Sequence, residues 1–144
     1  MSTLVKGIAH AALTVSDMEA SLRFYEEALG FEKAFEIHDD EDKPWIVYVH
    51  VGGDNFIELF YASPDMVKTQ DGIGHNHMCF AVDDIQAIAD NIVKAGYPLD
   101  VEPKSGKDYN SQCWTHDPDG NRIELMQMSD KSPQMQFIKN RSQE

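Results

Sequence analysis

Two histidines and two glutamates recur at nearly equal spacing along this chain, and together these residue types can bind a metal ion. His10 precedes Glu58 by 48 residues, and His77 precedes Glu124 by 47 residues. Two imidazole nitrogens and two carboxylate oxygens suit a borderline divalent ion such as Ni²⁺, Zn²⁺, Co²⁺, Fe²⁺ or Mn²⁺. An octahedral ion with four protein ligands keeps two positions for water or substrate, as catalysis requires. We therefore predict one divalent ion per site, with these four residues as its ligands.

An internal repeat relates the two histidines. The segment GIAHAALTVSD at 7–17 aligns with GHNHMCFAVDD at 74–84, and this register places His10 opposite His77. His75 has no histidine opposite it. A single histidine ahead of a strand is most often a turn or surface residue, so the repeat is what selects His77 over its neighbour.

The same repeat relates the two glutamates. NFIEL at 55–59 aligns with NRIEL at 121–125, so Glu58 lies opposite Glu124. For any one of these residues, an exposed structural role is the more common reading. Because four potential ligands stand at equivalent positions of a divergent repeat, we favour a shared metal site.

Each repeat has the pattern β-α-β-β-β, since apolar residues alternate with period two in the strands and follow helical spacing between them. We expect strands near 10–15, 31–37, 45–51 and 56–61 in the first copy, and near 77–82, 97–102, 111–116 and 122–127 in the second. We expect helices within 18–31 and 85–97. Ser16 or Asp17 and Asp83 or Asp84 are suitable N-caps, and Gly30 and Gly96 are suitable C-terminal stops.

Strand alternation places the histidine and glutamate of each copy on one face. In the first copy Ile57 and Leu59 form the core side of the last strand, so Glu58 points to the opposite face, as His10 does. Glu124 stands in the same way between Ile123 and Leu125. If the sheet curls so that these faces meet, two imidazoles and two carboxylates converge.

Composition limits the class of partner. The 144 residues carry 25 acidic and 12 basic side chains, a net charge of −13 that repels polyanions and argues against a nucleic-acid partner. No apolar run approaches the roughly 20 residues that span a bilayer, and the start shows no secretory signal, so we expect no membrane association and a cytoplasmic location. Cys79 and Cys113 are too few for a disulfide scaffold. The acidic run at 38–43 is expected to be a solvated loop.

The motifs HAALTVSDMEASLRFY and DPDGNRIEL give the chain a family resemblance. Over residues 7 to about 127 it resembles the vicinal-oxygen-chelate superfamily, which contains glyoxalases, bleomycin-resistance proteins and dioxygenases. The resemblance implies an α+β fold in which two modules curl into a mixed sheet around the metal. It also implies one domain over 1–144, with modules at about 7–62 and 74–127, a tail at 128–144 and, as in many small relatives, a homodimer.

Within that superfamily the His-Glu-His-Glu set resembles glyoxalase I, or lactoylglutathione lyase. This implies a lyase or isomerase in which the metal polarises a carbonyl of a small-molecule substrate and stabilises an enediolate, while a glutamate moves the proton. We assign Glu124 as the base and Glu58 as its partner. Bacterial glyoxalase I usually has Arg and Asn, which grip glutathione, where this chain has Thr14 and Ala62. The substrate is therefore a small carbonyl or a hemithioacetal, with or without glutathione.

Three alternatives remain open within the superfamily. Extradiol dioxygenases and fosfomycin-type thiol transferases need only His10, His77 and Glu124, whereas a bleomycin-resistance-type binding protein needs no metal ligand. Further candidates for substrate contact are residues of the third strand in each copy and basic residues of the second copy. These are Tyr48, His50, Trp114, Lys104, Lys107 and Arg122. His116 aligns with His50, but we expect it to cap its hairpin, because DPDG follows it directly.

The repeat register is testable by metal content. His77→Ala should remove most metal binding, whereas His75→Ala should leave it nearly intact, because only His77 has a counterpart in the first copy. Elemental analysis of the two purified variants measures the difference. Equal loss from both variants would contradict the register.

Overall fold

The computed structural model describes residues 4–69 and 72–141. The chain divides into two compact units, with the boundary between residues 69 and 70. Each unit contains one copy of the predicted repeat. In the described parts of the chain, no helix is long and apolar enough to cross a membrane.

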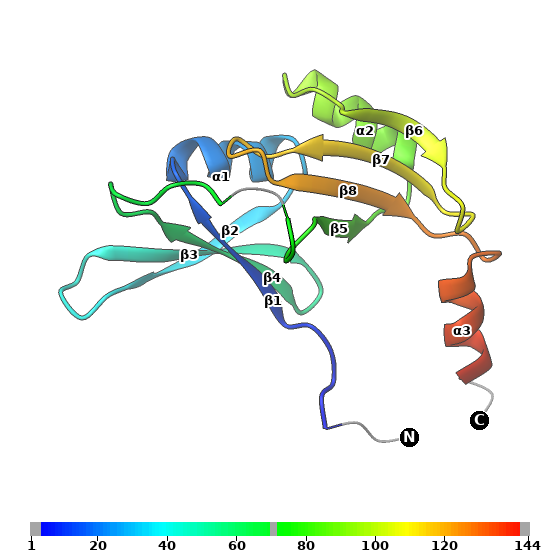
Figure 1. The fold of residues 1–144 in the computed structure, drawn as a ribbon, viewed down its shortest axis with the longest axis horizontal. Helices are drawn as coiled ribbons and strands as arrows, with labels where there is room; N and C mark the ends of the chain where they lie inside the picture. Colours follow the sequence, from blue (N-terminus) through cyan, green and yellow to red (C-terminus); the bar gives the residue numbers. More distant parts are fainter. Residues whose placement is uncertain (1–3, 70–71, 142–144) are drawn as a thin grey trace. The chain divides into compact units, whose positions relative to one another are not determined.

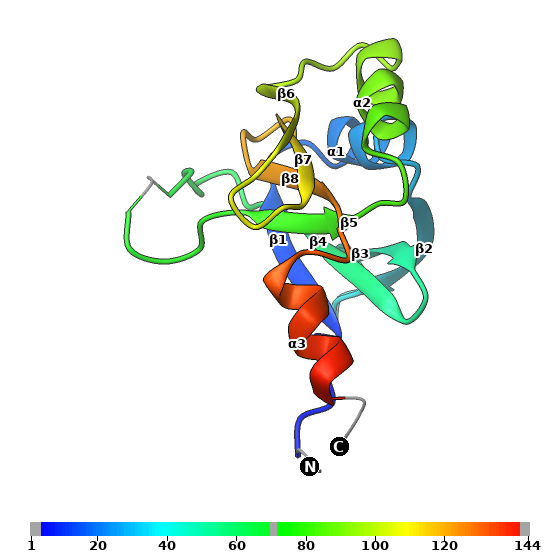
Figure 2. The ribbon, with the colours of Figure 1, turned by 90° about the vertical axis from the view of Figure 1, so that its right-hand side faces the viewer.

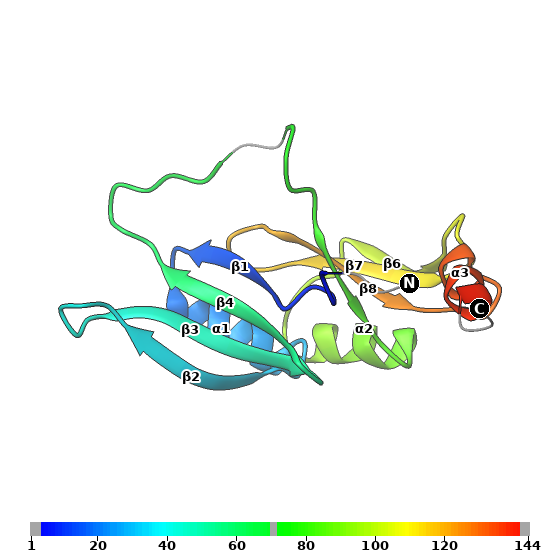
Figure 3. The ribbon, with the colours of Figure 1, turned by 90° about the horizontal axis from the view of Figure 1, so that it is seen from below.

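The first unit is a four-stranded mixed sheet with one helix. Its elements are β1 (His10–Val15), α1 (Met18–Glu27), β2 (Glu32–His38), β3 (Pro44–Gly52) and β4 (Asn55–Tyr61). The strand order is β1-β4-β3-β2, and β1 runs parallel to β4 while the other neighbours are antiparallel. Figure 1 shows these strands side by side, and Figure 3 shows α1 along one face of their sheet.

The second unit repeats this arrangement and adds a terminal helix. Its elements are β5 (Met78–Ala81), α2 (Ile85–Lys94), β6 (Val101–Ser105), β7 (Ser111–His116), β8 (Arg122–Gln127) and α3 (Pro133–Arg141). The order is β5-β8-β7-β6, again with one parallel pair, β5 and β8 (Figure 2). The predicted α+β class and the duplicated β-α-β-β-β pattern are confirmed. A single domain and a sheet curled around a metal stay predictions.

The helix ends follow the expected local chemistry. The carboxylates of Asp17 and Asp84 each accept a hydrogen bond from the backbone N–H three residues later, at 3.0 Å. Gly30 and Gly96 end the helical segments with φ of +76° and +93°, a region that disfavours any residue with a Cβ. Because both caps and stops are local, the sequence could specify them.

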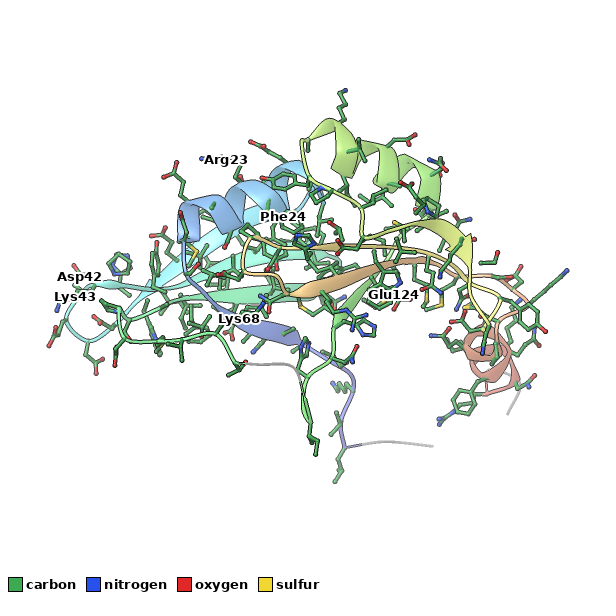
Figure 4. All side chains as sticks on the ribbon, turned by 45° about the horizontal axis from the view of Figure 1, so that its top comes forward. Arg23, Phe24, Asp42, Lys43, Lys68 and Glu124 are labelled. Carbon is green, nitrogen blue, oxygen red and sulfur yellow. The ribbon has the colours of Figure 1, made fainter. Side chains whose placement is uncertain are left out.

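The core of each unit lies between its helix and its sheet. Fully buried apolar side chains of the first unit include Phe24 (labelled in Figure 4), Ile57 and Leu59; in the second they include Ile92 and Leu125. Burial of each such side chain contributes about 1.5–3 kcal/mol. This packing fixes the pleat of β4 and β8, and therefore fixes which face their intervening residues occupy.

The structure differs from the sequence-based expectation at two places. β6 begins at Val101 rather than near residue 97, because the Tyr97 amide still donates to the Ile92 carbonyl at the end of α2 and Pro98 has no N–H to donate. The tail forms α3, a helix that the repeat pattern did not predict. On α3 Met135 is half-buried, whereas Phe137 and Ile138 are 61% and 52% exposed.

The acidic run at 38–43 is confirmed as an exposed loop. It closes the hairpin between β2 and β3, and Asp42 and Lys43 lie at its tip (Figure 4). The segments GGDN and DPDGN likewise join β3 to β4 and β7 to β8.

Ser21 provides a test of the α1 packing. Its side chain is fully buried and its Oγ has no hydrogen-bond partner in the described structure. An unsatisfied buried hydroxyl costs about 1–3 kcal/mol, and Ala is the better helix former. Ser21→Ala should therefore raise the free energy of unfolding by about 1 kcal/mol or more, measured by urea denaturation.

Ser132 is the matched control for this measurement. Ser132 is equally buried, but its Oγ accepts a hydrogen bond from the Met135 N–H at the start of α3, at 3.2 Å. Ser132→Ala should lower the free energy of unfolding by about 0.5–2 kcal/mol, the usual effect of losing such a cap. Destabilisation by both substitutions would contradict the assignment of Ser21 as unsatisfied.

Candidate functional site

In the first unit, His10 and Glu58 form a close pair across two parallel strands. His10 opens β1, and Glu58 lies at the centre of β4, where its register partner is Ala12. His10 Nε2 is 2.9 Å from Glu58 Oε2, with the imidazole 43% exposed and the carboxylate side chain only 10% exposed. The predicted histidine and glutamate of this copy therefore meet.

In the second unit, His77 and Glu124 form the equivalent pair. His77 directly precedes β5, and Glu124 lies in β8 (labelled in Figure 4), opposite Cys79 in register. His77 Nε2 is 2.9 Å from Glu124 Oε2, the same atoms and the same distance as in the first unit. The predicted pair of this copy also meets.

Asn76 fixes the orientation of the His77 ring. Its Oδ1 is 2.6 Å from His77 Nδ1. Because an amide oxygen only accepts hydrogen bonds, Nδ1 carries the proton and donates it to Asn76. Nε2 faces the Glu124 carboxylate. A histidine that binds a metal is commonly held by such a hydrogen bond from its other ring nitrogen.

The donor atoms of each pair have the spacing of neighbouring metal ligands. With metal–ligand bonds of about 2.1 Å at right angles, two donor atoms lie about 3.0 Å apart, and both pairs are at 2.9 Å. Each pair by itself therefore has donor types and a donor spacing that a borderline divalent ion accepts. Within residues 4–69 and 72–141, no three or more potential ligands lie close enough together to hold a metal ion. That all four residues bind one ion stays a prediction.

Aromatic side chains surround Glu58. The Tyr48 hydroxyl donates a hydrogen bond to Glu58 Oε1 from the directly opposite position of β3. Together with burial, this bond raises the pKa of Tyr48, because ionisation of the phenol would remove it. The Tyr48 ring stacks on Phe35 at 4.5 Å and meets the edge of Phe56 at 6.2 Å. The first pair thus lies on an aromatic face.

The surroundings of Glu124 are more polar. The Trp114 ring lies 4.6 Å from the His77 ring, and its Nε1–H donates to Gln112 Oε1 at 2.6 Å rather than to the glutamate. The Arg122 guanidinium lies 5.0 Å from the centre of the Trp114 ring, a cation–π contact beside the pair.

The remaining candidates have other partners or are exposed. His50 Nε2 is 2.8 Å from the Gly53 carbonyl in the hairpin, and His116 Nδ1 is 2.9 Å from Asp100. Lys104, on β6 opposite Gln112, and Lys107, in the following loop, are exposed. Sequence reasoning missed Asn76 and Gln112, and only the position of Asn76 next to His77 could have indicated its role.

Cys79 is not a candidate nucleophile. Cys79 is exposed, but desolvation of its thiolate and the neighbouring Glu124 carboxylate raise the pKa of the thiol to about 12. The thiolate is the reactive form, so this side chain stays protonated near neutral pH. The histidine and glutamate pairs therefore remain the candidates on this face.

Comparison with known proteins gives one family. The family model described as the glyoxalase/bleomycin resistance protein/dioxygenase superfamily matches residues 7–125. A probable lactoylglutathione lyase of Vibrio cholerae is 31% identical over 124 residues, which cover 83% of this chain and 89% of that protein.

Solved structures agree with this match. A glyoxalase family protein from Enterococcus faecalis aligns with a TM-score of 0.71 at 25% identity, covering 87% of this chain and all of that one. Glyoxalase I from Zea mays aligns with a TM-score of 0.70 at 27% identity. That alignment covers 85% of this chain but only 44% of the maize protein, so the chain spans less than half of it.

Thiol alkylation tests the protonation state of Cys79. With a pKa of about 12, the thiolate fraction at pH 8 is about three orders of magnitude smaller than that of an ordinary thiol. Each thiolate of higher pKa is also more nucleophilic, and this offsets about half of the rate loss on a logarithmic scale. Native Cys113→Ser protein, which retains only Cys79, should react with iodoacetamide on the order of 50-fold more slowly than the same protein in urea. Equal rates in the two conditions would show that Cys79 is an ordinary thiol.

Proposed function

Because the chain belongs to the glyoxalase/bleomycin resistance protein/dioxygenase superfamily, we propose that it is a metal-dependent, glyoxalase I-like lyase or isomerase. Its reaction moves a proton between adjacent carbons of a small carbonyl or hemithioacetal substrate. The observation that carries the proposal is the duplicated pair: in each unit an imidazole Nε2 faces a largely buried carboxylate oxygen at 2.9 Å. His10, Glu58, His77 and Glu124 would hold one divalent ion.

The four ligands favour proton transfer over the other reactions of the superfamily. Dioxygenase and thiol-transferase sites use two histidines and one glutamate, which leaves a second glutamate without a role. In this chain Glu58 is buried and paired with His10 as closely as Glu124 is paired with His77. A metal-free binding protein has no need of either pair.

The chain's own residues perform the proton transfer. A bound divalent ion supplies positive charge beside a substrate oxygen, which makes the neighbouring carbon more acidic. Glu124 accepts the proton from that carbon and returns it to the adjacent carbon as a general base and then a general acid. Glu58 is its partner carboxylate. His10 and His77 stay in place, the latter through its hydrogen bond to Asn76.

The two pairs have different neighbours for a substrate. Arg122, over the Trp114 ring, is the cation nearest the second pair among the candidates and suits an anionic group. Tyr48 and His50 suit an apolar or hydrogen-bonding group beside the first pair, and Lys104 and Lys107 provide further positive charge. The partner is thus a small molecule, and the protein acts as a homodimer like many small relatives.

Metal content is the first test of the proposal. Protein reconstituted with Ni²⁺, Co²⁺ or Zn²⁺ and then desalted should retain about one ion per chain by elemental analysis. Glu124→Gln should retain part of the metal, because the amide oxygen is a weaker ligand, and should lose proton exchange between substrate and deuterated solvent. A wild-type chain without retained metal would contradict the proposal.

Glutathione dependence is the second test. With Thr14 and Ala62 at the expected Arg and Asn positions, the hemithioacetal of glutathione lacks charge-assisted hydrogen bonds of about 1.5–3 kcal/mol each, or roughly one to two decades of affinity. The metal-loaded protein should therefore be a poor catalyst with methylglyoxal and glutathione in steady-state kinetics. A kcat/KM near 10⁶ M⁻¹s⁻¹, within the usual range of about 10⁴–10⁸ for dedicated enzymes, would identify an ordinary glyoxalase I instead.

A further inference from the structure

The two glutamates have the same histidine contact but different second contacts. Glu58 uses Oε2 toward His10 and accepts the Tyr48 hydroxyl with Oε1. Glu124 uses Oε2 toward His77, and no described side chain donates to its other oxygen. The two copies therefore have the same histidine–glutamate contact but differ in the side chains that donate a second hydrogen bond to the glutamate.

One residue difference produces this asymmetry. Tyr48 and Trp114 occupy equivalent positions, each directly opposite the glutamate of the neighbouring strand. The phenol reaches across to Glu58, whereas the indole N–H bonds to Gln112 on its own strand. The indole of Trp has a single N–H group. Because that group donates to Gln112, Trp114 has no second donor for Glu124.

Tyr48 is itself held rigidly. Its ring stacks on Phe35 with an angle of 17° between the planes and meets Phe56 edge-on. These contacts fix the ring, so the hydroxyl donates from a defined position and little side-chain entropy is lost when the bond forms. A donor fixed in this way also fixes the carboxylate that accepts from it.

We propose that Tyr48 is a positioning residue that keeps Glu58 in place as a permanent ligand and leaves Glu124 as the glutamate without a second restraint. The inference rests on the proposed function, since it concerns the same metal-binding residues. Hydrogen bonds from outside the ligand set orient the ligands, and their loss typically reduces metal affinity 10- to 100-fold.

The test compares metal affinities, with Co²⁺ alone as the probe and a chromophoric chelator as competitor. Tyr48→Phe keeps the ring and removes only the hydroxyl, so it should weaken Co²⁺ binding 10- to 100-fold. Tyr61→Phe is the matched control, because Tyr61 lies on β4 with Glu58 but projects to the opposite face of the strand. It should change the affinity by less than about twofold. Equal affinities of the wild type and Tyr48→Phe would overturn the inference.

A double-mutant cycle separates positioning from a general structural effect. If Tyr48 acts through Glu58, the Tyr48→Phe effect should disappear in a Glu58→Gln background, whose amide is a poorer acceptor and ligand. It should persist in a Glu124→Gln background. An equal effect in both backgrounds would overturn the inference while leaving the proposed function intact. A wild-type chain that binds no Co²⁺ or other divalent ion would overturn the proposed function and the inference together.

Discussion

The pairing of a buried carboxylate with an imidazole at a parallel strand junction is the interaction on which each unit's site depends. Glu58 and Glu124 are each 7% exposed, and a buried carboxylate without a partner costs several kcal/mol. Each is compensated by a histidine from the neighbouring strand or the residue just before it, at 2.9 Å. The same negative charge that makes burial costly makes the position attractive to a cation. The proposed metal affinity and the stability of each unit would therefore have a common origin at these positions.

The sheet topology delivers this pairing. A β-α-β-β-β unit returns its last strand beside its first, so residues about 50 positions apart become neighbours. The buried Ile57 and Leu59 in β4, and their equivalents in β8, leave the intervening glutamate no other face to occupy. Core packing on one side of the sheet thus decides which side chains face the other side.

The sequence predicted what local rules or the repeat determine. Strand alternation assigned the faces, aspartates and glycines marked the helix ends, and the repeat distinguished His77 from His75. The contacts that depend on side-chain reach were not predictable: Tyr48 to Glu58, Trp114 to Gln112 and Asn76 to His77. The sequence pattern does not indicate whether an aromatic donor bonds to a residue of the neighbouring strand or to a residue of its own strand. The helix α3 also escaped prediction, because its residues have no counterpart in the first copy.

The two copies share the histidine–glutamate pair and differ in the residues that surround it. Because the histidine–glutamate geometry is the same in both units, the pairs themselves do not distinguish the two carboxylates. The distinction must come from their neighbours, which are aromatic beside Glu58 and include Arg122 and Gln112 beside Glu124. The proposed proton transfer needs one carboxylate that stays fixed and one that moves, and the proposed substrate contact needs two different ends. On that proposal, both requirements are met by the divergence of residues outside the two histidine–glutamate pairs.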